Sequence, residues 1–111
     1  MFRDDTQLAR ACRTLLATVR LDRLWTEHGP TAEARRLLDA DGGPLSSGER
    51  VMLLAAWAFW NGSGGLTLAD VLERLDVEPA EALCFLVLAS KYGSDSVDDW
   101  IAEHTRIGVA S

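Results

Sequence analysis

Lysine, histidine, cysteine and proline are all scarce in this sequence. Its 111 residues include two cysteines, two histidines and three prolines, and Lys91 stands alone beside ten arginines. The two cysteines, Cys12 and Cys84, lie far apart and form no CxxC motif, so we expect reduced thiols rather than disulfides. The preference for arginine, together with abundant alanine, leucine, aspartate and glycine, indicates a bacterial coding sequence rich in G and C.

Long hydrophobic runs and a secretory signal are also missing. The longest apolar runs are Val51–Trp60 and Ala82–Ala89. Both are far shorter than the roughly 20 residues that a membrane-spanning helix needs. The charged start, Met1–Asp5, lacks the apolar region of a signal peptide. We therefore expect a cytoplasmic protein with no membrane association.

Length and composition indicate one globular domain spanning 1–111. The chain is 48% hydrophobic and 25% charged, which is close to the average for folded domains. A single domain of this size excludes large catalytic architectures such as an α/β barrel.

Helical spacing of apolar residues extends over most of the sequence, and no alternating strand pattern is found. It predicts an all-α fold, a compact bundle of about six helices. The predicted helices span about 5–28, 32–40, 47–60, 68–75, 79–92 and 96–106. We expect residues 107–111 to form a frayed tail.

Capping signals support these boundaries. Ser46 and Glu49 match a capping box, and Asn61–Gly65 should end the helix that follows. Thr31 and Thr67 are predicted N-caps. We expect 41–44 to end the second helix, 76–78 to form a tight turn and Pro79 to open the fifth helix.

The formal net charge of −6 is unevenly distributed. Residues 1–50 contain eight arginines and eight acidic residues, so their net charge is zero. Residues 51–111 contain three basic and nine acidic residues, so they carry the whole net charge of −6. The acidic half is suited to a basic partner, and it would compete with nucleic acid if that partner also binds nucleic acid.

Arginines of the first predicted helix lie away from its apolar stripe, which includes Leu8, Cys12, Leu15 and Val19. The arginines on this possible basic face are Arg3, Arg10, Arg13 and Arg20. Two interpretations are open: a surface for phosphates or an acidic partner, or an ordinary solvated helix face.

Residues 67–90 have the layout of a helix-turn-helix. The segment Thr67–Val77 resembles the first helix and turn of bacterial helix-turn-helix regulators, which implies binding to DNA. The second helix departs from that family at its N-terminal end, which in the family contacts the DNA bases. Its first residues, Pro79-Ala80-Glu81-Ala82, include a carboxylate and no arginine or lysine. We therefore regard nucleic-acid binding as the weaker interpretation and packing as the stronger one.

The apolar helices 51–60 and 79–92 are hydrophobic on every side. Such a helix has to be buried all round, and a small domain can bury one helix in this way more easily than two. The apolar helix surface that the domain cannot bury predicts a partner interface formed by aromatic residues of both helices. The alternative is that the same residues fill the core. The predicted interface residues are Trp57, Phe59, Trp60 and Phe85.

Catalytic and metal-binding groupings are not recognisable in this sequence. Asp98, Asp99, Glu103 and His104 cluster near the C-terminus without an HExxH-type partner set, so we interpret them as a solvated helix face. His28 is expected at a helix C-terminus. The glycine-rich segment 61–65 is interpreted as a linker. Cys12 and Cys84 are both expected to be buried, unreactive thiols.

The sequence therefore predicts a non-enzymatic interaction module without cofactor or metal. We expect a small helical adaptor, regulator or inhibitor that binds another protein or forms a homodimer. The alternative function is that of a helix-turn-helix transcriptional regulator.

Overall fold

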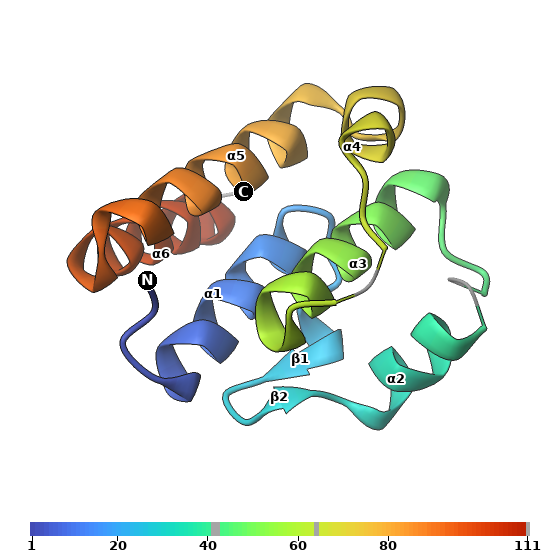
Figure 1. Cartoon of the computed structure of the whole chain (residues 1–111), viewed down its shortest axis with the longest axis horizontal. Coiled ribbons are helices and arrows are strands. Elements are labelled where there is room, and N and C mark those ends of the chain that lie inside the picture. Colours follow the sequence, from blue (N-terminus) through green and yellow to red (C-terminus); the bar gives the residue numbers. More distant parts are fainter. Residues whose placement is uncertain (41–42, 64, 111) are drawn as a thin grey trace.

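The computed structural model describes residues 1–40, 43–63 and 65–110, with side chains described as far as Thr105. These residues form six α-helices, a single 3-10 turn and one two-stranded hairpin (Figure 1). The helices are α1 (Asp5–Ala17), α2 (Ala32–Asp39), α3 (Ser47–Asn61), α4 (Leu68–Arg74), α5 (Val77–Tyr92) and α6 (Ser94–Ala110). The structure is 73% helical, which confirms the predicted all-α bundle.

Side-chain caps fix the starts of four helices. The Ser46 hydroxyl accepts from the backbone N–H of Glu49, and the Glu49 carboxylate accepts from that of Ser46, so the predicted capping box is present. Thr31 and Thr67 cap α2 and α4 as predicted, and Asp4 caps α1. Helix α3 ends at Asn61 and is capped by Gly62, whose φ of +77° is a conformation that glycine adopts easily.

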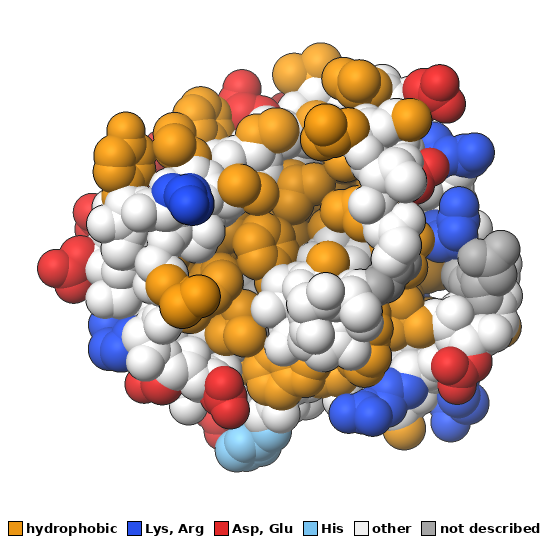
Figure 2. Space-filling view, in the orientation of Figure 1, with side chains coloured by type: hydrophobic (Ala, Val, Ile, Leu, Met, Phe, Trp, Pro, Cys, Tyr) orange, Lys and Arg blue, Asp and Glu red, His pale blue; other side chains and the backbone are white. Residues whose placement is uncertain are grey.

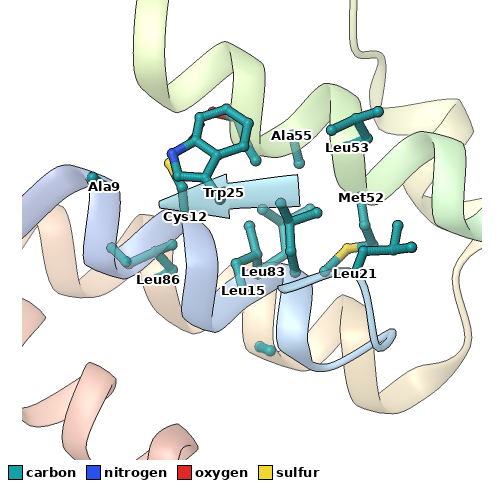
Figure 3. Close-up of a cluster of buried hydrophobic side chains, with 14 of the residues drawn as sticks. Ala9, Cys12, Leu15, Leu21, Trp25, Met52, Leu53, Ala55, Leu83 and Leu86 are labelled. Atoms are coloured by element: carbon teal, nitrogen blue, oxygen red, sulfur yellow. Dashed lines mark hydrogen bonds between the residues drawn. The ribbon is translucent and has the colours of Figure 1, made fainter. Parts of the chain in front are cut away.

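Helix α1 lies at the centre of the bundle. It packs against α3 on one side and against α5 and α6 on the other. In Figure 3, Trp25 of the hairpin is directed toward Cys12 of α1, close to α3. The largest fully buried side chains come from α1, the hairpin region, α3, α5 and α6; they include Leu15, Leu16, Leu21, Leu24, Trp25, Met52, Leu53, Leu86 and Val97.

A buried glutamine joins the N-terminus to α6. The Gln7 side chain is 1% exposed, and its amide donates to the carbonyl of Ser94 and to the carboxylate of Asp98. Arg3 also binds Asp98, at 3.0 Å. Hydrogen bonds from Arg3 and Gln7 hold the pKa of the Asp98 carboxyl below its ordinary value.

The first helix is much shorter than predicted. Helix α1 ends at Ala17, and the chain turns at Arg20, whose φ is +62°. A 3-10 turn η1 (Asp22–Leu24) follows, and then the hairpin of β1 (Trp25–Thr26) and β2 (Gly29–Pro30). The prediction of a helix to residue 28 was wrong because Leu21 and Leu24 keep a helix-like spacing although both point into the core from the turn.

Other boundaries differ by a few residues. Helix α5 begins at Val77 after Asp76, so Pro79 lies in its first turn but does not open it, and 76–78 is not a separate turn. Helix α6 begins at Ser94, two residues before the predicted start at Ser96, and runs to Ala110. The frayed tail at 107–111 stays a prediction, and Ser111 is outside the described residues. Two other predictions fall partly outside the described residues. They are the end of the second helix at 41–44, which includes 41–42, and the linker at 61–65, which includes Gly64.

Among the helices described, none is long and apolar enough to cross a membrane.

Candidate interaction surface

Helix α5 carries hydrophobic side chains toward both the core and the solvent. Its inward side contributes Ala82, Leu83, Leu86 and Ala89 to the core. On its outward side, Phe85, Leu88 and Tyr92 are 52%, 47% and 76% exposed. Their spacing of three and four residues places them on one side of the helix. Helices α1 and α6 therefore cover one side of α5 and leave the other to solvent, so the domain does not bury this apolar helix completely.

Helix α4 adds two exposed leucines to this apolar surface. Leu68 and Leu72, one turn apart, are 81% and 82% exposed, and Val77 at the start of α5 is 79% exposed. We call the combined surface the α4–α5 face. Its members are Leu68, Leu72, Val77, Phe85, Val87, Leu88 and Tyr92. Figure 2 shows hydrophobic side chains along the upper edge of the molecule, over α4 and α5, and in the hollow between α5 and α3.

Four exposed carboxylates lie in the segment that connects the two helices and in the helix turns beside it. They are Glu73, Asp76, Glu78 and Glu81. Within the described part of the chain, none of the four is in an ion pair. Asp70 differs, because it pairs with Arg74 at 3.4 Å. The Thr67 hydrogen bond and, to a smaller extent, the Arg74 charge hold the pKa of the Asp70 carboxyl below its ordinary value.

The predicted interface residues of α3 are largely occupied by contacts within the chain. Trp60 packs edge-on against Trp25, with ring centroids 6.0 Å apart, and Phe59 packs edge-on against Phe2 at 5.8 Å. The guanidinium of Arg35 lies 5.8 Å from the ring centroid of Trp57. All three α3 aromatics are partly buried, whereas Phe85 is exposed. The four residues therefore do not form one surface.

The exposed members of α4 were missed by sequence reasoning. Leu68 and Leu72 have the spacing of a core-facing stripe, and that spacing alone does not distinguish a buried stripe from an exposed one. The signal that could have found them is the composition of α4, a seven-residue helix with apolar residues on more than one side.

The predicted basic face is not continuous. Arg3 precedes α1 and is paired with Asp98 and Asp4. Arg10 and Arg13 are exposed on α1, but Arg20 lies in the turn after the helix has ended. The early end of α1 therefore separates Arg20 from the other arginines. His28, predicted at a helix end, lies in the hairpin turn instead.

In the predicted cluster on α6, Asp98 and His104 take part in structural contacts, whereas Asp99 and Glu103 are exposed. Asp98 binds Arg3 and Gln7, and Nδ1 of His104 lies 2.8 Å from the carbonyl oxygen of Trp100 while its ring stacks on that of Trp100. Among the residues described, no group of three or more histidine, cysteine, aspartate or glutamate side chains could hold a metal ion.

A cleft of about 350 Å³ lies between α2 and α3, lined by Arg35, Leu38, Asp39, Leu54 and Trp57. Its lining combines apolar and charged side chains, and Arg35 already lies against Trp57.

The helix-turn-helix layout is present, but its exposed chemistry does not suit DNA. Helices α4 and α5 follow one another across a two-residue connection. The first turns of α5 present Asp76, Glu78 and Glu81, and carboxylates at these positions repel phosphates. The exposed middle of α5 presents Phe85 and Leu88, which lack the hydrogen-bonding groups that read base edges.

The two cysteines lie in opposite environments. Cys12 is fully buried, and burial raises the pKa of its thiol to about 12. Cys84 is exposed on α5, next to Phe85, so the prediction that it is buried was wrong.

Thiol titration should separate the two cysteines. With Ellman's reagent at pH 8, we expect the folded protein to react rapidly at one thiol, and at both thiols after unfolding in guanidinium. Cys84→Ser should abolish the rapid reaction, whereas Cys12→Ser should leave it unchanged. Equal reactivity of the two thiols in the folded state would contradict the burial of Cys12.

No family model, curated protein or solved structure matches this chain.

Proposed function

We propose that this chain is a non-enzymatic protein-interaction module whose contact surface is the α4–α5 face. The observation that carries the proposal is the exposure of seven large apolar side chains on two consecutive helices. Single exposed apolar side chains are ordinary on a soluble protein, whereas seven large ones on two consecutive helices mark a candidate interaction surface. Leu68, Leu72 and Val77 alone are about four-fifths exposed each, so the face is costly to leave in water unless a partner covers it.

The geometry of the face suits a helical or extended segment of another protein. Helix α5 has 16 residues, which gives a length of about 24 Å at 1.5 Å per residue. Anchor residues repeated every three or four positions are typical of surfaces that bind a helix. Aromatic residues such as Phe85 and Tyr92 supply large contact area with few rotatable bonds.

The face can be tested by selecting ligands without assuming their identity. We expect a displayed peptide library panned on the immobilised full chain to yield peptides that bind the wild type. Leu72→Glu combined with Phe85→Glu should abolish their binding, because each glutamate places an unpaired charge inside the contact. Ala32→Glu is the matched control, since Ala32 is exposed in the first turn of α2, where a carboxylate is tolerated.

Circular dichroism should show that the variants keep the helical content of the wild type. Peptides that bind the double glutamate variant as tightly as the wild type would place the binding surface elsewhere. Failure to enrich any specific peptide over several rounds would count against an interaction module.

Several finer predictions from the sequence remain open to direct measurement. The homodimeric state is tested by sedimentation velocity over a range of concentrations. A cytoplasmic location, a bacterial origin and a role as adaptor, regulator or inhibitor stay predictions. The alternative of a DNA-binding regulator is not favoured by the carboxylates of α5, and it predicts binding that falls steeply with salt.

A further inference from the structure

We infer that the partner of the α4–α5 face is a basic amphipathic helix of another protein. The inference rests on the proposed function and adds the chemistry of the occupant. The face combines apolar anchors with four carboxylates that have no cationic partner among the described residues. An amphipathic helix with leucine-like residues on one side and lysine or arginine beside them matches both features.

The positions of the carboxylates relative to the apolar residues carry the argument. Glu81 lies one turn after Val77 and one turn before Phe85, so it is on the outward side of α5 within the apolar surface. Glu78 flanks the same turns, and Glu73 and Asp76 are in or next to the α4–α5 connection. A helix docked along α5 would bring its own flanking side chains within reach of these groups, well inside a Debye length of about 8 Å.

Charge also argues against a second copy of this chain as the occupant. The segment 68–92 contains five carboxylates and two cations, Arg74 and Lys91, which gives a net charge of −3. Arg74 is already paired with Asp70. A symmetric dimer through this face would therefore bring two negatively charged surfaces together, whereas a basic helix would be attracted to the same surface.

The area of the face is sufficient for such a contact. Seven large side chains, each about half exposed or more, present several hundred Å² of apolar surface. That is comparable with the roughly 800 Å² that each partner buries in a stable interface. The exposed apolar residues of the face supply the contact area. Its carboxylates favour a positively charged partner and speed the association of that partner with the face.

The inference is tested with two synthetic 18-residue helices that share the same leucine positions. One peptide carries lysine at every polar position, and the other carries glutamate. We expect fluorescence anisotropy with the full chain to show at least tenfold tighter binding of the lysine peptide at low salt, and weaker binding as salt rises. Equal affinity for the two peptides would overturn the inference.

Two pairs of substitutions separate the face from the general negative charge of the protein. Glu78→Gln with Glu81→Gln should weaken lysine-peptide binding about fivefold, the loss of two exposed charge contacts. Glu27→Gln with Asp39→Asn removes the same charge from the hairpin and α2, and it should leave affinity unchanged. An equal effect of the two pairs would overturn the inference, as would undiminished binding to the Leu72→Glu, Phe85→Glu variant.

The library selection and sedimentation distinguish this inference from the proposed function. Selected peptides that need the α4–α5 face but carry no excess of basic residues would overturn the inference and support the proposed function. A wild-type dimer that Phe85→Glu converts to a monomer would do the same, because a second copy would then occupy the face. Absence of any face-dependent ligand or self-association would overturn both.

Discussion

Trp25→Ala is expected to lower the free energy of unfolding by about 4 kcal/mol, the cost typical of truncating a large buried aromatic residue. Trp25 is 1% exposed, and it is among the largest fully buried side chains described. It lies on β1, where it contacts Trp60 edge-on and connects the hairpin to α3. Alanine would leave a cavity between these elements and would expose the remaining ring of Trp60.

The matched control is Trp57→Ala, which removes a partly buried tryptophan from α3. It should cost about 2 kcal/mol, because part of this side chain already faces water although the rest packs against the core. Chemical denaturation followed by circular dichroism measures both variants. If Trp25→Ala does not fold, Trp25→Phe, which keeps a ring, should still fold and be clearly less stable than the wild type. Equal losses for Trp25→Ala and Trp57→Ala would contradict the assigned burial.

The indole nitrogen of Trp25 also affects the stability of the core. Its Nε1 is buried and has no hydrogen-bond partner among the residues that the structure describes. An unsatisfied buried donor offsets part of the stabilisation that the ring provides. The large net effect expected for Trp25→Ala therefore comes from apolar packing.

The helices could be predicted from the sequence because their signals are local. A serine followed by a glutamate three residues later is sufficient to define the start of α3, and a glycine after Asn61 defines its end. The hairpin could not be predicted in this way. Its strands have two residues each, too few for an alternating pattern, and they are held in place by α1 and by the contact of Trp25 with Trp60 of α3.

The candidate site shows a different limit of sequence reasoning. Helix α5 is apolar on all sides, so its sequence does not indicate which side faces the core. That side is decided by packing against α1, which is distant in sequence, and against α6, which follows α5 directly after Gly93. Phe85 is exposed, whereas Trp57, Phe59 and Trp60 of the equally apolar α3 pack against Arg35, Phe2 and Trp25. The partner interface predicted for these four residues stays a prediction.

Gly29→Ala is expected to destabilise the protein by about 3 kcal/mol through two separate effects. The first is conformational, because Gly29 has a φ of +118°, which costs an L-residue about 1–2 kcal/mol. The second is steric, because an added Cβ would lie 2.6 Å from Cζ2 of Trp60. The Trp60 ring is held edge-on by Trp25, so it has to move away from its packing partner to admit a methyl group.

Gly62→Ala separates the two effects. Gly62 also has a positive φ, +77°, but a Cβ at this position would meet nothing within 4 Å. Its substitution should therefore show the conformational cost alone, about 1 kcal/mol. A melting-temperature difference of roughly 8 °C between the two alanine variants would correspond to the remaining 2 kcal/mol. Equal melting temperatures would mean that the Trp60 ring moves without cost, and the Trp25–Trp60 contact would then not be a rigid part of the core.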